Sequence, residues 1–431
     1  MLTAIAIATS LVVGLWAVLA VFDRPQLMIP IAVAAVVLDT EGALNEPIAL
    51  TMGAFTTYPS DVVLVLALAV IALQMACGRV RIRGWSSVWA GLFGLATVAL
   101  IRGALVVGVE SAVASNRAML LTSCLGLFAS LQSIHPEVTV RWITWSWVAA
   151  ATAFGLEALF FLAGAGLGSF ASNSTRALNA PAALIVAQAG LLLYWSLKDR
   201  GLLRYFTITP AALLVLLSQQ RTVQIAGLVG VLVVILLERP GQRVMRIAAV
   251  ALVGLASVTV LINVDEGFAN SLNQAVSEPF RSDSTFAWRF SGWKSLAEEQ
   301  AGDATTDLVF GDPAGAETER RVRYSVGVRT TTASAHSQWF ESLVAVGVVG
   351  LALTAVAMIG PVVVAARRRP IGLEPLVTAS AAALVFTLTY QLQASQAMLL
   401  GSLSALVGLR SPERGRAAGP RSGPVGSAMK P

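Results

Sequence analysis

The sequence predicts an all-α polytopic membrane protein with about 12 transmembrane helices. Its 431 residues are 56% hydrophobic and only 13% charged, whereas a soluble domain carries about 25% charged residues. The mean hydropathy is +0.73, and apolar stretches of roughly 20 residues recur along nearly the whole chain, which is typical of membrane-spanning helices.

The predicted spans follow one another with short polar connections. They are residues 2–22, 27–40, 61–78, 86–101, 116–133, 139–163, 180–197, 206–219, 222–237, 247–263, 337–360, 375–393 and 396–410. The second is short for a crossing and the last is weakly apolar, so the expected count is about 11 to 13. The first segment has no Lys or Arg before its apolar run, so we interpret it as a retained helix and not a cleaved signal peptide.

Basic residues fix the expected orientation. The net charge is +6, but the cations gather in short clusters between apolar spans, which are residues 79–83, 198–204, 238–246, 366–370 and the C-terminal tail. Such clusters favour the cytoplasmic side, whereas a nucleic-acid-binding protein gathers them on one folded surface. The segments expected outside are then residues 41–60, 102–115, 164–179, 219–222 and 264–335.

This pattern divides the chain into four parts. They are N-terminal transmembrane helices at 1–263, an extracytoplasmic loop at 264–335, C-terminal transmembrane helices at 336–410, and a disordered cytoplasmic tail at 411–431. The loop is the only long segment outside the predicted membrane region, and loops of this length are usually functional. Phe286, Phe290 and Trp293 recur at near-helical spacing, so short amphipathic helices are expected within the loop.

Four polar residues lie at the predicted outer ends of helices, namely Arg176, Arg221, Arg289 and His336. Guanidinium groups pair bidentately with phosphoryl oxygens. An imidazole with a pKa of about 6.5 can accept a proton near neutral pH. Together they suggest a site for a lipid-linked diphosphate and an incoming hydroxyl. The alternatives are arginines that extend towards lipid headgroups and a histidine that only caps its helix.

Four short segments carry these residues in a fixed order. They are STRALNAPAALIVAQ with Arg176 and Asn179, QQRTVQIAGLVGVLVVIL with Arg221, WRFSGWKSLAEEQAGDATTDLVFGDPAG with Arg289, Trp293 and Gly311, and HSQWFESLVAVGVVGLALTAV with His336, Gly347 and Gly350. In this order, and with the long loop before the last, they resemble the O-antigen ligase and polymerase family. The resemblance covers about residues 60 to 410. Three departures are Ser337 in place of Asn, Gln220 in place of Ser, and a segment before Gly311 that lacks the family's proline.

The resemblance implies a membrane glycosyltransferase that needs no metal and no other cofactor. Such an enzyme moves a glycan from a polyprenyl-diphosphate carrier to an acceptor sugar hydroxyl at the outer face of the cytoplasmic membrane. Arg221 and Arg289 would hold the diphosphate, and His336 would accept the acceptor's proton, with inversion at the anomeric carbon. We expect Arg176, Trp288, Trp293 and Ser337 to bind substrate. Its partners would be the lipid-linked glycan, an acceptor glycan or glycolipid, and the bilayer, with no nucleic acid.

Several alternatives stay open. Transfer by a ligase and by a polymerase would share this chemistry and differ in the acceptor. Other membrane glycosyltransferases use an acidic pair in an outer loop for a divalent cation, and Asp39 with Glu41 is the nearest match here. A transporter or lipid-linked oligosaccharide flippase is the rival function, although it would place its charged groups near the bilayer midplane. A scaffold protein would tolerate replacement of the arginines and His336.

Overall fold

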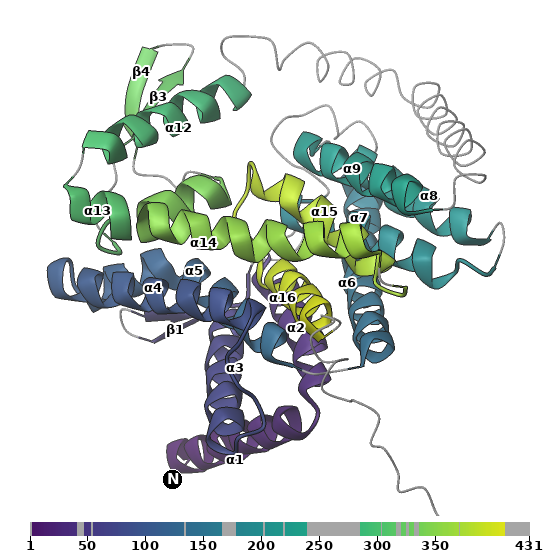
Figure 1. The fold of residues 1–431 in the computed structure, drawn as a ribbon, viewed down its shortest axis with the longest axis horizontal. Coiled ribbons are helices and arrows are strands. Elements are labelled where there is room, and N and C mark those ends of the chain that lie inside the picture. The colour runs from purple at the N-terminus through teal and green to yellow at the C-terminus, as the bar shows by residue number, and fades with distance from the viewer. Residues whose placement is uncertain are drawn as a thin grey trace, which may run out of the picture.

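The computed structural model describes residues 2–40, 47–52, 55–132, 135–165, 178–200, 203–218, 220–238, 285–302, 304–315, 320–324, 327–331, 336–369 and 371–409. This part of the chain is mostly helical (Figure 1). Its α-helices are α1 (Leu2–Asp23), α2 (Met28–Asp39), α3 (Pro59–Ala76), α4 (Trp85–Val106), α5 (Val109–Leu131), α6 (Pro136–Ala165), α7 (Ala180–Ser196), α8 (Leu203–Leu217), α9 (Arg221–Leu237), α12 (Thr285–Gly302), α13 (Thr305–Phe310), α14 (Gln338–Arg368), α15 (Glu374–Thr387) and α16 (Ala394–Leu409).

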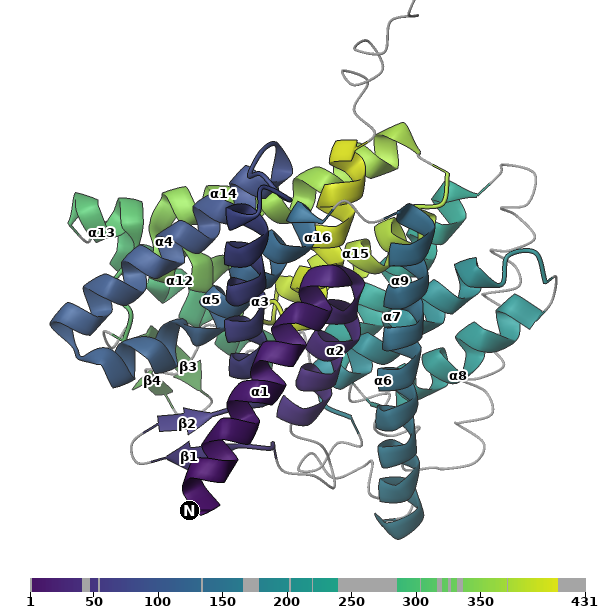
Figure 2. The ribbon, with the colours of Figure 1, turned by 90° about the horizontal axis from the view of Figure 1, so that it is seen from below.

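Most helices lie where the hydropathy pattern predicts a span. The expected span at 222–237 corresponds to α9, and the one at 139–163 lies inside α6. The expected span at 247–263 and the C-terminal tail lie outside the described residues. The described residues also contain two short antiparallel hairpins that were not predicted, β1 (Leu50–Met52) with β2 (Phe55–Thr57) and β3 (Arg320–Tyr324) with β4 (Gly327–Thr331). Figure 2 shows the two hairpins, β1 with β2 and β3 with β4, on the same side of the molecule.

Helix length separates two groups of apolar helices. In the described part of the chain, five helices are long and apolar enough to cross a membrane, namely α3, α4, α5, α6 and α14. Helices α7, α8, α9, α15 and α16 are apolar but shorter; the 14 residues of α15 rise only about 21 Å, against a hydrocarbon thickness of about 30 Å. The count of about 12 crossings therefore stays a prediction.

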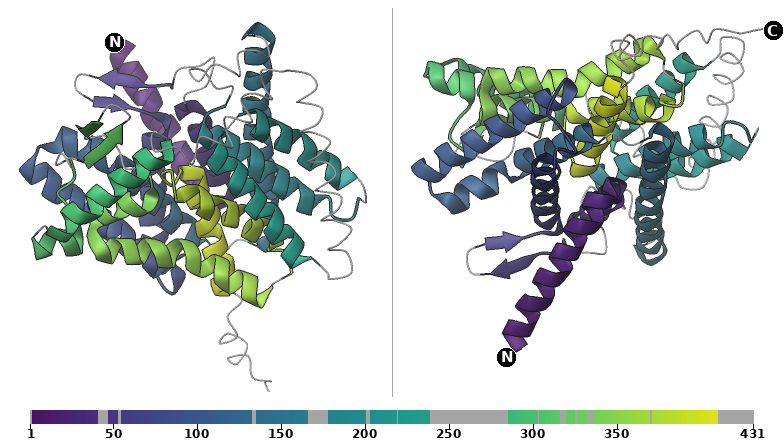
Figure 3. Two further views of the ribbon diagram at one scale, coloured as in Figure 1. Left: turned by 90° about the horizontal axis from the view of Figure 1, so that it is seen from above. Right: turned by 60° about the horizontal axis from the view of Figure 1, so that its bottom comes forward.

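The first two predicted spans form one sharply bent pair. The axes of Val12–Asp23 and Pro25–Asp39 meet at 117°, and a single 3-10 turn, η1 (Pro25–Leu27), joins them. Pro25 lacks an amide hydrogen and cannot continue the α-helical bonding of α1, so the helix ends before it. In Figure 3, α1 extends away from the other helices and α2 returns into them.

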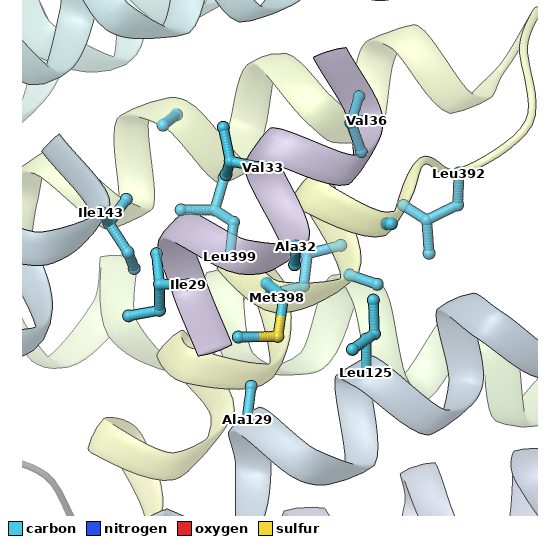
Figure 4. Packing of buried hydrophobic residues seen from close by; sticks show 14 of the residues in the cluster. Ile29, Ala32, Val33, Val36, Leu125, Ala129, Ile143, Leu392, Met398 and Leu399 are labelled. Carbon is cyan, nitrogen blue, oxygen red and sulfur yellow. The ribbon is translucent and has the colours of Figure 1, made fainter. Parts of the chain in front are cut away.

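Helix α2 lies at the centre of the hydrophobic core. Ile29, Ala32, Val33 and Val36 on α2 are at most 5% exposed, and Figure 4 shows them among side chains from three other helices, namely Leu125 and Ala129 of α5, Ile143 of α6, and Met398 and Leu399 of α16. Because this helix is apolar on all sides, it is stable only when other helices cover it. The core therefore joins the N-terminal and C-terminal parts of the chain.

Helix α14 is not the single straight helix expected at 337–360. Gly347 has φ +69° and ψ −171°, a conformation available almost only to glycine. The Ser342 Oγ and Thr354 Oγ1 atoms lie 3.2 Å apart, although 12 residues along a straight helix span about 18 Å. The chain therefore folds back at Gly347, with a first arm of nine residues before it and a second arm of 21 after it.

The segment that follows α12 is fixed to the turn of α14 and to α4. The Asp312 amide donates to the Val344 carbonyl at 2.7 Å. Arg102 of α4 donates to the Gly311 carbonyl at 2.7 Å and to Asp307 Oδ1 at 2.6 Å. A Cβ atom on Gly347 would collide with the Val309 carbonyl, so this close approach needs glycine. Figure 1 shows α13 beside α14 and α4.

Helix α12 is tied to the same segment at its C-terminal end. Gln300 Nε2 donates to both carboxylate oxygens of Asp312 at 3.1 Å. Helix α12 runs from this anchor towards residues 288 and 289, and it packs against β3 and α14. This places the N-terminal half of α12 over the first arm of α14.

Candidate functional site

His336 lies directly before the first arm of α14. Its φ of +52° is unusual for a residue with a side chain and costs of order 1–3 kcal/mol. The imidazole is partly buried and lies against Trp288 of α12, with ring centroids 5.8 Å apart at 40°. A strained backbone that holds a titratable ring against an aromatic neighbour is frequent at functional sites.

Arg289 is held by an aromatic ring. Its guanidinium carbon lies 4.9 Å from the ring centroid of Tyr390, a geometry that stabilises the cation through the π face. Its Nε atom is buried and has no hydrogen-bond partner among the described residues. Within the same described ranges, no carboxylate forms an ion pair with Arg289. The guanidinium is therefore a cation that no described carboxylate neutralises.

Arg221 is the first residue of α9, and both of its neighbours in sequence are bonded to one loop. The hydroxyl of Tyr390 donates to Gln220 Oε1 at 3.4 Å, and Thr389 Oγ1 donates to Thr222 Oγ1 at 2.9 Å. Gln220 Nε2 also donates to the Leu178 carbonyl at 3.3 Å. The start of α9 is thus fixed on both sides of Arg221.

The loop that makes these contacts joins α15 to α16, and we call residues 389–392 the 389–392 loop. It also holds the start of the first arm of α14, because the Gln338 amide donates to the Tyr390 carbonyl at 3.0 Å. The Leu392 amide in turn donates to Gln338 Oε1 at 2.9 Å. One short loop therefore contacts the segments that carry Arg221, Arg289 and His336, which are far apart in sequence.

The predicted aromatic residues pack on the first arm of α14 and on His336. Trp293 stacks on Phe340 with ring centroids 5.3 Å apart and an interplanar angle of 10°, and Trp288 contacts the imidazole as described. Both indole rings are partly exposed. Their rings are therefore held by aromatic neighbours, and their role in substrate binding stays a prediction.

Two other predicted residues have different outcomes. Ser337 is only 1% exposed, and its Oγ has no hydrogen-bond partner within the described part of the chain. Arg176 lies outside the described residues. Asn179, from the same motif, caps α7 by accepting a hydrogen bond from the Ala182 amide at 3.0 Å, which is the usual role of asparagine at a helix start.

The candidate metal pair does not gather further ligands. Asp39 Oδ2 accepts a hydrogen bond from the Ser60 amide at 3.1 Å, and Glu41 lies outside the described residues. Among the residues that the structure describes, no three or more His, Cys, Asp or Glu side chains are placed to hold a metal ion. Metal independence stays a prediction.

Sequence reasoning missed Tyr390, Gln338 and Gln220 as site residues. The predicted span 375–393 placed Tyr390 inside a helix, but α15 ends at Thr387. The available signal was the polar run TYQLQASQ at 389–396, because such a run is costly inside a lipid-exposed helix.

Comparison with known proteins bears on these segments directly. Residues 206–355 match the model of the family described as O-antigen ligase. This match confirms the family resemblance. No curated protein matches the chain. The O-antigen ligase match includes Arg221, Arg289 and His336, whereas Tyr390 lies outside it. Together with the apolar helices, it indicates a membrane protein with a function in glycosyl transfer.

Proposed function

We propose that the protein is a metal-independent, inverting glycosyltransferase of the cytoplasmic membrane, with its site on the outer side. It transfers a glycan from a polyprenyl-diphosphate carrier to an acceptor sugar hydroxyl, as a ligase or polymerase of cell-surface polysaccharide. The observation that supports this most is the 389–392 loop, which contacts the segments carrying Arg221, Arg289 and His336. The basic clusters at the opposite helix ends support the orientation.

The proposed reaction is a single displacement at the anomeric carbon. The acceptor oxygen forms a bond to that carbon while the bond to the carrier diphosphate breaks. The bonding electron pair leaves with the diphosphate oxygen, and the acceptor's proton passes to His336. Arg221 and Arg289 stabilise the negative charge that develops on the leaving diphosphate, since charged hydrogen bonds to phosphoryl oxygens strengthen as that charge grows.

The first test compares variants of the two histidines in a strain that lacks the chromosomal gene. Asn tolerates the left-handed backbone of His336 but is no general base, so His336→Asn should lower transfer about 10²- to 10⁴-fold. His135→Asn is the matched control, because His135 is exposed and predicted to face the cytoplasm. Surface glycan and lipid-linked precursor are measured at equal protein level.

The second comparison uses two arginines that both stack on aromatic rings. Arg289→Ala should abolish mature glycan, whereas Arg79→Ala, which removes a guanidinium 3.9 Å from the Phe22 ring, should not. Precursor that accumulates on the outer leaflet supports transfer. Accumulation of the precursor on the cytoplasmic leaflet would instead favour the flippase function. Normal glycan in both His336→Asn and Arg289→Ala would reject the assignment of these residues to catalysis.

A further inference from the structure

Tyr390 contacts all three segments of the candidate site through different groups. Its ring lies under the Arg289 guanidinium, its hydroxyl donates to Gln220, and its carbonyl accepts from the Gln338 amide. On its other side the ring stacks on Phe386, with centroids 4.6 Å apart and an interplanar angle of 11°. Phe386 is fully buried, so the Tyr390 ring is supported from the core.

The nature of the contact to Arg289 suits anion binding. A carboxylate partner would occupy the N–H groups of the guanidinium and would repel a diphosphate. An aromatic ring instead attracts the cation through its face and carries no formal charge. The N–H groups at the guanidinium edge then stay available to phosphoryl oxygens. No carboxylate within the described ranges takes that place.

We propose that Tyr390 is a positioning residue that holds the Arg289 guanidinium for the carrier diphosphate. This inference rests on the proposed function. The ring acts through Arg289, and the hydroxyl adds little, because its hydrogen bond to Gln220 is long at 3.4 Å. The ring, more than the hydroxyl, is therefore the group whose removal should weaken diphosphate binding.

The test measures binding of geranylgeranyl diphosphate to the purified full-length protein in detergent, with geranylgeraniol as the uncharged competitor. Tyr390→Phe retains the ring and should stay within about twofold of the wild type. Tyr390→Leu removes the π face and should weaken binding about tenfold, within the range of about two- to thirtyfold that a cation–π contact supports. If the Leu variant is not recovered folded, Tyr390→Met replaces it, because Met fills irregular space without a π face.

A double-mutant cycle separates positioning from a general packing role. If Tyr390 acts through Arg289, the variant with both Arg289→Ala and Tyr390→Leu should bind no more weakly than Arg289→Ala alone. Phe128→Leu is the control for loss of a buried aromatic ring, since Phe128 is 1% exposed in α5. It should lower the melting temperature without changing diphosphate affinity.

The outcomes are distinct. Additive losses in the double variant, or unchanged binding in Tyr390→Leu, would overturn the role of Tyr390 and leave the proposed function standing. A wild-type protein that does not bind the diphosphate, or binds geranylgeraniol equally well, would overturn both. Weakened binding in Tyr390→Leu, retained binding in Tyr390→Phe and no further loss in the double variant would support the inference.

Discussion

The fold-back of α14 can be tested by a disulfide between its two arms. The Ser342 and Thr354 hydroxyl oxygens lie 3.2 Å apart, and both residues are at most 1% exposed. Because each oxygen is one bond from its Cβ atom, cysteine sulfurs at these two positions are close enough to approach bonding distance. In a straight helix the same positions would be about 18 Å apart, and no bond would form.

We therefore expect the Ser342→Cys/Thr354→Cys variant to form an intramolecular disulfide on mild oxidation. The variant also carries Cys77→Ser, because the thiol of Cys77 is exposed and would otherwise form disulfides of its own. The control pair Leu351→Cys/Val363→Cys has the same spacing within the second arm, where about 18 Å separates the residues. After denaturation, free thiols are labelled with a maleimide-linked polymer and counted from the resulting gel shift. Equal thiol counts in the two pairs would refute the fold-back.

Two further substitutions test how the segment after α12 is fixed. Gly347→Ala should lower the free energy of unfolding by at least about 1–3 kcal/mol, because of its backbone conformation and the collision with Val309. Gly94→Ala, where an added methyl group meets nothing within 4 Å, should be neutral or stabilising by up to about 1 kcal/mol; equal melting temperatures would contradict this. Arg102→Ala should lower the free energy of unfolding by about 1–3 kcal/mol. It should also make the segment after α12 more susceptible to limited proteolysis. Arg79→Ala, at an exposed ion pair, should leave the cleavage rate unchanged, and equal cleavage in both would show that Arg102 is not an anchor.

The sequence was sufficient to predict most helices because each must be apolar over many residues, and that property is local. Helix α9 begins at Arg221, one residue from the predicted start. The bend at Pro25 had a local cause, although its angle of 117° depends on packing. Gly347 was singled out as part of a motif, yet its role was missed. The positive φ of Gly347 does not alter the hydropathy of either arm. A helix hairpin and a straight helix therefore have the same hydropathy pattern.

The candidate site was predicted in part. Arg176, Arg221, Arg289 and His336 were expected to surround one site. The 389–392 loop contacts the segments that carry the last three, and Arg176 lies outside the described residues. Tyr390 was missed because its contacts join residues more than 50 positions apart in sequence, and such pairing cannot be inferred from spacing alone. The contact of Trp288 with the imidazole likewise depends on the packing of α12 against β3 and α14, which residue spacing does not reveal.

The anchor near Gly311 has a consequence for exchanging segments between related proteins. Its bonds to Val344 and Arg102 use the main-chain amide of Asp312 and the carbonyl of Gly311, whereas its bonds to Arg102 and Gln300 also need the carboxylates of Asp307 and Asp312. A chimera that replaces β3 would remove a strand that packs against α12, the helix that carries Trp288 and Arg289.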